Sequence, residues 1–217
     1  MYKILVNMKK KIIVLVITTL LILGITFLSW PISTITNPIV KRLLGILLNL
    51  SNGAVAFVAI KLTKIDIGIE LKNYWQFIFG ATIALSVSLF VAFIPAFFGF
   101  SIVGNHQNFD WGTLLYSLFF YFLIIGPVEE LIFRVYFQET FISFFKKHSW
   151  IGVIIAAAMF GIWHLINGSL FQVLFTFGFG LLFGFAKYFL KKFKYLGLSF
   201  GHGLYDFLNV IVRMFIV

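Results

Sequence analysis

Long apolar stretches alternate with short polar segments along the chain. A helix needs about 20 mostly apolar residues to cross the hydrocarbon core of a bilayer. The pattern predicts helices that reach or approach this length over residues 12–30, 43–60, 77–100, 111–142, 150–166, 170–190 and 196–217. We therefore expect an all-α fold, a polytopic transmembrane helix bundle with about seven spans.

The composition agrees with a location in the membrane. The chain is 61% hydrophobic and 11% charged, whereas soluble domains average about 25% charged residues. Its 217 residues leave room for a single integral-membrane domain, residues 1–217, and no separate soluble one. The chain contains no cysteine, which excludes disulfides, a thiol nucleophile and zinc bound by cysteine.

Basic residues outnumber acidic ones by 17 to 7, so the formal net charge is +10. The enrichment of Lys and Arg in cytoplasmic segments of membrane proteins explains this excess better than nucleic-acid binding does. We expect the lipid bilayer, and no nucleic acid, as a partner. With a cytoplasmic N-terminus, most of the basic clusters fall on one side, and the first helix is expected to be an uncleaved signal anchor.

One stretch departs from the apolar pattern. Residues 126–134 read G-P-V-E-E-L-I-F-R inside an otherwise apolar helix. An ionisable group at the centre of a bilayer costs about 2.5–3.5 kcal/mol, so such groups mark functional sites facing the protein interior. Glu130 and Arg134 share a helix face at i,i+4, whereas Glu129 points about 100° away. We expect Glu130 to pair with Arg134 and Glu129 to be available for chemistry, beside a kink at Pro127. A purely structural ion pair is the alternative.

Three more ionisable residues lie in the later helices. His164 is near the end of the fifth predicted helix, and His202 and Asp206 share a face of the seventh at i,i+4. Imidazole and carboxylate groups bind zinc-type ions, and a catalytic zinc site leaves one position open for water. The same groups can hold a water molecule without a metal, with Glu129 as the general base. The residues leave both readings open.

Glycines accompany these residues. Gly201 and Gly203 flank His202 and permit close backbone approach, and the spacings Gly180-x-x-x-Gly184 and Gly197-x-x-x-Gly201 predict packing seams.

The motifs of three other enzyme classes are absent or incomplete. The chain has no H-E-x-x-H and no G-x-x-x-x-G-K-[ST], and the match of residues 197–201 to G-x-S-x-G lacks the later histidine that a hydrolase triad needs.

Together, the three groups resemble the signature of the CAAX-protease and bacteriocin-processing family of membrane endopeptidases, also called CPBP or Abi proteins. That signature is E-E-x-x-x-R, then F-x-x-x-H, then H-x-x-x-[N/D], on separate helices. The chain offers Glu129-Glu130…Arg134, Phe160…His164 and His202…Asp206, in this order. Val135 stands where the family often has Gly, and Asp206 where the prenyl-processing branch usually has Asn.

The resemblance implies an intramembrane endopeptidase that cleaves a membrane-associated peptide or protein. Residues 1–110 would supply the N-terminal spans and residues 111–217 the catalytic core helices. By position, Glu129 would activate water, His164, His202 and Asp206 would complete the catalytic set, and Glu130 with Arg134 would support it. A divalent metal, with zinc as the expected ion, would be held by His164, His202 and Glu129. The composition is similar to that of bacterial members.

Two other functions are compatible with the residues. A non-enzymatic membrane protein for bacteriocin self-immunity, or a scaffold, would keep the fold without using the catalytic groups. A proton-coupled transporter would use the same Glu and His residues as a relay. The lack of an internal repeat disfavours the transporter.

Overall fold

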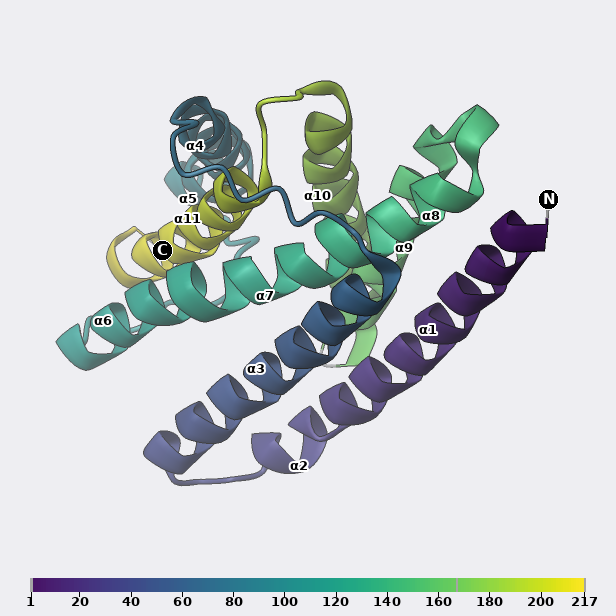
Figure 1. Cartoon of the computed structure of the whole chain (residues 1–217). Helices are drawn as coiled ribbons and strands as arrows, with labels where there is room; N and C mark the ends of the chain where they lie inside the picture. The colour runs from purple at the N-terminus through teal and green to yellow at the C-terminus, as the bar shows by residue number, and fades with distance from the viewer. Residues whose placement is uncertain (1, 167, 217) are drawn as a thin grey trace. The chain divides into compact units, whose positions relative to one another are not determined.

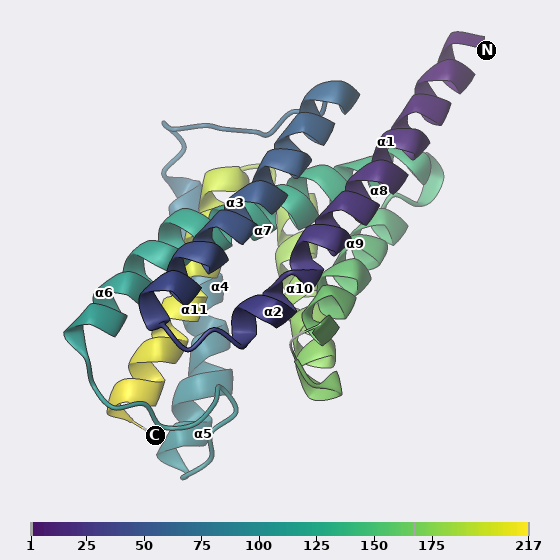
Figure 2. The same ribbon diagram turned by 90° about the horizontal axis from the view of Figure 1, so that it is seen from below.

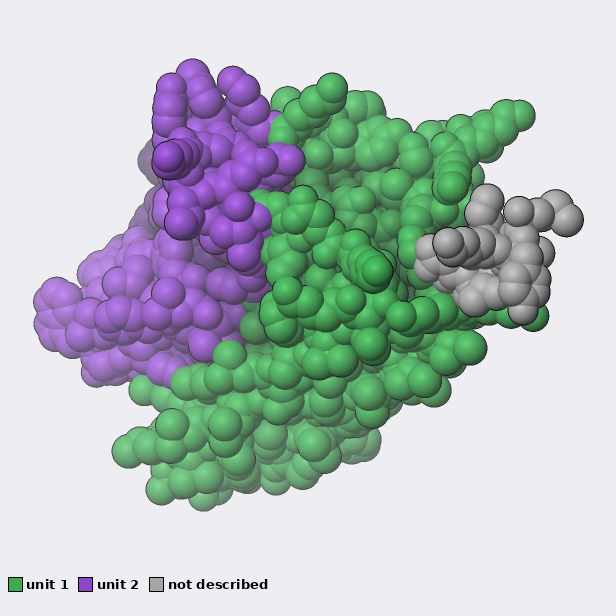
Figure 3. All heavy atoms as spheres, in the orientation of Figure 1, with its two compact units in different colours: residues 1–68, 128–191 green, residues 69–127, 192–217 purple. Residues whose placement is uncertain are grey.

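The computed structural model describes residues 2–166 and 168–216, and these residues form helices joined by short connections. The fold class predicted from the sequence, an all-helical membrane bundle, is confirmed. The chain forms two compact units (Figure 3). The first unit combines the chain up to Gly68 with Val128–Lys191, and the second combines Ile69–Pro127 with Lys192–Val217. This grouping does not test the prediction of a single membrane domain.

The first unit contains a long antiparallel helix pair followed by the later helices (Figure 1). Helix α1 is joined through the short α2 to α3. Helices α8, α9 and α10 come later in the chain. Their bounds are α1 Tyr2–Phe27, α2 Ser29–Ser33, α3 Pro38–Thr63, η3 Leu131–Phe137, α8 Gln138–Phe144, η4 Lys146–His148, α9 Trp150–Trp163, η5 His164–Ile166 and α10 Leu170–Phe189.

The second unit packs its C-terminal helix against its first one. Helix α11 lies along α4, and the π-helical segment η2 also contacts α11. The bounds are α4 Trp75–Ser88, η1 Leu89–Phe93, α5 Ile94–Phe97, α6 Trp111–Phe120, η2 Tyr121–Ile125 and α11 Tyr195–Phe215. Helix α7, Gly126–Glu130, crosses the boundary between the two units.

Every predicted helix is found, and four segments among the described residues are long and apolar enough to cross a membrane. These are Met8–Ser33, Pro38–Thr63, Trp75–Phe97 and Leu170–Phe189, with Trp150–Ile166 as a shorter apolar helix. The chain is therefore an integral membrane protein. The cytoplasmic position of the N-terminus stays a prediction from the distribution of Lys and Arg.

Helix α3 begins earlier than the apolar pattern predicts. The side chain of Asn37 accepts hydrogen bonds from the N–H groups of Ile39 and Val40, at 3.0 and 3.2 Å, and Pro38 occupies the first helical position. An Asn cap followed by Pro is a helix-start signal, because Pro at this position loses no hydrogen bond. The polar stretch in the middle of α3 does not break it. Asn52 donates to Thr26 Oγ1 at 3.1 Å and joins α3 to α1.

Wide helical turns interrupt two of the helices. Residues 111–144 are continuously helical, but Tyr121–Ile125 and Leu131–Phe137 are π-helical, on either side of α7. Pro127 lies two residues after the first of these segments, and Pro95 lies two residues after η1. A proline ring collides with the carbonyl four residues earlier, and a wider turn relieves that collision. The predicted disturbance at Pro127 therefore takes the form of a π turn just upstream.

Glycine seams fix the helix contacts inside each unit. In the first, a Cβ on Gly180 would lie 3.1 Å from Ala157 Cα, and one on Gly184 would lie 2.8 Å from Val153 Cγ1, so α10 packs closely on α9 (Figure 2). In the second, a side chain on Gly197 would collide with the backbone of Gln76. Both predicted seams are confirmed.

Candidate active site

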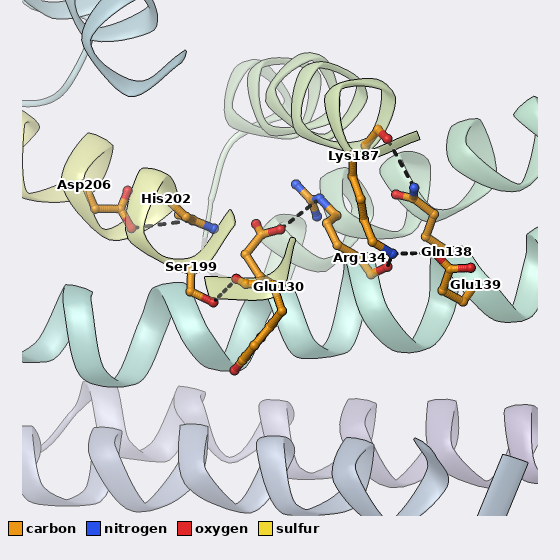
Figure 4. Close-up of polar contacts among 10 residues, drawn as sticks. Glu130, Arg134, Gln138, Glu139, Lys187, Ser199, His202 and Asp206 are labelled. Atoms are coloured by element: carbon orange, nitrogen blue, oxygen red, sulfur yellow. Dashed lines mark hydrogen bonds and ion pairs between the residues drawn. The ribbon is translucent and has the colours of Figure 1, made fainter. Parts of the chain in front are cut away.

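The acidic motif begins with a buried ion pair. Arg134 Nε lies 3.4 Å from Glu130 Oε2, and the two side chains are 1% and 0% exposed (Figure 4). The predicted pair at i,i+4 is confirmed, although Arg134 lies in the π segment and not in an α-helix. Removing either partner of a buried ion pair leaves an uncompensated charge, so the burial of Glu130 depends on Arg134.

Phe160 contacts both Arg134 and His164. The guanidinium carbon of Arg134 lies 4.4 Å from the centre of the Phe160 ring, and this ring meets His164 edge-on with the centroids 4.7 Å apart. Nη1 and Nη2 of Arg134 are buried and form no hydrogen bond with any described residue. The ring face of Phe160 and the charge of Glu130 compensate this guanidinium. Phe160 thus links the arginine of the first motif to the histidine of the second.

His164 is held in one tautomer. Its Nδ1 lies 2.8 Å from the backbone carbonyl oxygen of Phe160. A carbonyl oxygen only accepts hydrogen bonds, so Nδ1 carries the proton, and in the neutral ring Nε2 has the lone pair. His164 is half-buried at the junction of α9 and η5. This side chain can accept a proton or bind a cation through Nε2.

Glu129 is half-buried on α7, directly before Glu130. The charge of Arg134 acts on Glu129 as well as on Glu130, more strongly on Glu130. The prediction that the arginine principally serves Glu130 therefore agrees with the structure, and Glu129 lies within the same field.

Lys187 of α10 was missed as a member of this cluster. Its ammonium donates to the carbonyl oxygen of Arg134 at 2.7 Å and to a carboxylate oxygen of Glu139 (Figure 4). In an α-helix the N–H of Gln138 would bond to Arg134 O, but here it bonds to Phe133 O. The π turn thus diverts a backbone donor, and Lys187 replaces it. In the sequence, Lys187 lies in the last turn of an apolar helix, a position that is also typical of a lysine at the membrane surface.

A second bond joins α10 to the end of the π segment. Gln138 is buried, and its Nε2 donates to the carbonyl oxygen of Gly184 at 3.1 Å (Figure 4). A side chain on Gly184 would approach Gln138 Oε1 to 3.1 Å, so the glycine permits this contact. Together with Lys187, this bond fixes α10 against the helix that carries Glu129 and Glu130.

The third motif forms its own pair in the second unit. His202 Nε2 lies 3.6 Å from Asp206 Oδ2, and the side chains are 5% and 21% exposed (Figure 4). The predicted shared face at i,i+4 is confirmed. The separation is that of an ion pair when the imidazole is protonated, and it exceeds an ordinary hydrogen bond.

Glycines bring other backbones close to His202. A side chain on Gly201 would lie 2.8 Å from Gly80 Cα, and one on Gly203 would lie 2.7 Å from Tyr121 O. Gly126 meets the same helix, since a Cβ there would collide with Ser199 O. The predicted close approach beside His202 is confirmed, with α4 on one side and η2 on the other.

Tyr121 and Arg213 are further polar residues around Asp206 that sequence reasoning had not connected with it. The side chain of Tyr121 interacts with Asp206 and is hydrogen-bonded to Arg213. Arg213 Nε also donates to Asn209 O at 3.3 Å, one turn earlier on α11. Asp206 therefore belongs to a polar network that includes a tyrosine and a cation.

The predicted site residues thus lie in two sets, one in each unit. Glu129, Glu130, Arg134 and His164 belong to the first unit, and His202 and Asp206 belong to the second. Within either unit, the described residues include no group of three His, Asp or Glu side chains that could hold a metal ion. The predicted ligands His164, His202 and Glu129 come from both units. The metal stays a prediction.

Part of the chain matches a known protein family. Residues 111–208 match the family model described as type II CAAX prenyl endopeptidase Rce1-like. The matched residues run from the start of α6 into α11 and include all three motifs. No curated protein and no solved structure matches the chain.

Proposed function

We propose that this chain is a member of the CAAX prenyl endopeptidase family, whose model matches residues 111–208, and that it cleaves a membrane-associated peptide or protein with Glu129 as general base. The observation that carries the proposal is the span of the family match. Residues 111–208 contain Glu129, His164, His202 and Asp206, each on a helix whose local packing is defined. The three sequence motifs lie within the residues that match the family model.

In the proposed reaction, Glu129 takes a proton from a water molecule while the water oxygen bonds to the carbonyl carbon of the substrate peptide. The carbon–nitrogen bond then breaks, and the proton moves from Glu129 to the leaving amine. A carboxylate placed in this way typically contributes about 10²–10⁴-fold in rate.

His164 and His202 are assigned to positioning the water and polarising the peptide carbonyl. The tautomer of His164 supports this role, because its Nε2 accepts a hydrogen bond or a metal while Nδ1 is bonded to Phe160 O. Asp206 Oδ2 lies 3.6 Å from His202 Nε2, beside the imidazole ring. Glu130 and Arg134 support Glu129 through the fixed geometry of α7 and η3.

The donor chemistry also fits a divalent metal. A histidine that binds zinc through one nitrogen usually donates a hydrogen bond through the other, as His164 does to Phe160 O. His164, His202 and Glu129 would hold the ion in this proposal. When bound, a zinc ion lowers the pKa of its water and polarises carbonyl oxygens.

Cleavage by purified protein in liposomes tests the proposal. The substrates are a farnesylated peptide ending in a CAAX sequence and the same peptide without the farnesyl group. Glu129→Gln should lower the cleavage rate at least about 100-fold, whereas Glu70→Gln, at an exposed carboxylate, should leave it unchanged. Undiminished cleavage by Glu129→Gln would overturn the catalytic role of Glu129, whereas no cleavage by the wild type would favour the immunity or scaffold function.

Two further measurements separate the parts of the proposal. Metal analysis of the wild type against His164→Ala should show loss of a bound ion if a metal assists. Because the chain has no cysteine, Glu129→Cys with His202→Cys creates a unique pair. Efficient bridging by a short bifunctional reagent is expected if both residues serve one peptide bond, and a pair that never bridges would contradict that assignment.

A further inference from the structure

An apolar groove lies between α1 and α3, in the first unit. Val14, Ile17, Thr18 and Leu21 line it from α1, and α3 supplies the other wall with Ala54, Val55, Val58, Ala59 and Leu62. Its volume is about 320 Å³, within the range of small-molecule sites. Thr18 and Ala59 are buried at its floor, whereas Ile17, Leu21, Val58 and Leu62 are exposed. The groove is therefore open along one side of the helix pair.

The groove has a cause in the sequence. Helices α1 and α3 run antiparallel and side by side (Figures 1 and 2), and the bond from Asn52 to Thr26 sets their register. Ala54 and Ala59 are small, so α3 does not fill the space in front of the larger side chains of α1. The lining residues of α1 lie between positions 14 and 21, about 10 Å along the helix, so the groove runs along the helix pair.

Basic residues gather at one end of the groove. Lys10 precedes Val14 by four positions, so it lies on the groove face of α1. Lys61 directly precedes Leu62 on α3, and its ammonium lies 5.1 Å from the centre of the exposed Phe57 ring. Both lysines are exposed, as are their sequence neighbours Lys9 and Lys64. Lys11 is not part of this set, because it donates to Ser143 Oγ at 3.1 Å.

We propose that this groove binds an anionic phospholipid, with one acyl chain between α1 and α3 and the phosphate at Lys10 and Lys61. The apolar walls fit a hydrocarbon chain, and the exposed lysines attract a negative headgroup at the membrane surface. The carboxylate nearest in sequence, Asp66, accepts from the N–H of Gly68 at 3.0 Å. The site uses residues outside the family match at 111–208 and does not depend on the proposed protease activity.

Native mass spectrometry of the full chain tests the site with phosphatidylglycerol and phosphatidylcholine that carry identical acyl chains. The wild type should retain phosphatidylglycerol more than about tenfold better. Lys10→Gln with Lys61→Gln should reduce that retention about tenfold and leave phosphatidylcholine unchanged. The matched control, Lys146→Gln with Lys147→Gln, removes the same charge from exposed lysines elsewhere and should have no effect.

The acyl chain is tested separately from the headgroup. Ala54→Phe places a ring in the groove and should weaken retention of both lipids at least about tenfold, since the space a chain would occupy is filled. Leu50→Phe adds a ring at an exposed position on a different face of α3 and should not.

Three results would overturn the proposal. These are equal retention of the two lipids by the wild type, unchanged phosphatidylglycerol retention after the Lys10 and Lys61 substitutions, and displacement of the lipid by farnesylcysteine. The last result would assign the groove to a prenyl group of the substrate. None of these readouts uses cleavage, so failure of this site is distinguishable from failure of the protease proposal.

Discussion

The two sets of predicted site residues are held in place by opposite means. Around Glu130 and His164, side chains attract one another: an ion pair, a ring stacked on a guanidinium and a lysine on a backbone carbonyl. Next to His202, Gly201 and Gly203 carry no side chain, so neighbouring backbones come close. The first arrangement depends on charge and the second on space.

The difference predicts different kinds of sensitivity. A cluster of polar partners tolerates changes in volume and fails when one charge is removed. A glycine seam tolerates changes in charge nearby and fails when a methyl group is added against a backbone. Substitutions in each region can therefore confirm the comparison or break it.

The largest effect is expected for Arg134→Met. The change leaves Glu130 buried without its cation and should lower the free energy of unfolding by about 3–5 kcal/mol. Chemical denaturation in detergent micelles measures it. Glu130→Leu combined with Arg134→Met removes both charges and should recover most of the loss. A double variant as unstable as the single one would show that the ion pair is not what matters here.

Lys187→Met should be the next most damaging change. It removes the donor that replaces the diverted backbone N–H at Arg134 O, and a hydrogen bond from a charged group contributes about 1.5–3 kcal/mol. The control is Lys191→Met, at an exposed position two residues after the end of α10, which is expected to change stability by less than about 0.5 kcal/mol. Equal effects of the two substitutions would remove Lys187 from the cluster.

Gly203→Ala tests the other region. Its added carbon would lie 2.7 Å from Tyr121 O and 3.0 Å from Phe122 Cα, so a backbone has to move, at a cost of about 1–3 kcal/mol. Gly178→Ala is the matched control, because nothing lies within 4 Å of that position in α10. The control should be neutral or stabilising by up to about 1 kcal/mol. If Gly203→Ala behaves in the same way, close packing does not hold His202.

The smallest effect is expected for Phe160→Leu. A leucine keeps the site apolar but removes the ring under Arg134, and a buried cation–π contact contributes about 0.5–2 kcal/mol. Thermal unfolding of the variant, compared with Phe137→Leu at another buried phenylalanine, separates this contribution from the loss of packing. A loss no greater than that of Phe137→Leu would mean that the guanidinium does not depend on the ring.

The sequence predicted the helices, the Glu130–Arg134 and His202–Asp206 pairs and the glycine seams, because each depends on spacing within one helix. It did not predict the π turns, since no residue type marks them except a proline two positions later. It also missed Lys187, Tyr121 and Phe160 as partners. Their contacts join helices far apart in the chain, which helical periodicity does not report.

The π segment Leu131–Phe137 has a consequence for the length of this helix. A π turn holds one residue more than an α-helical turn, since the N–H of Gln138 bonds to Phe133 O, five residues earlier. Gln138 and Glu139 face Gly184 and Lys187 directly after this turn. Deleting one residue between 135 and 137 would convert the same hydrogen bond into an α-helical one and keep both side chains facing α10. Adding one residue there would instead rotate both side chains by about 100°, so this stretch should tolerate losing a residue better than gaining one.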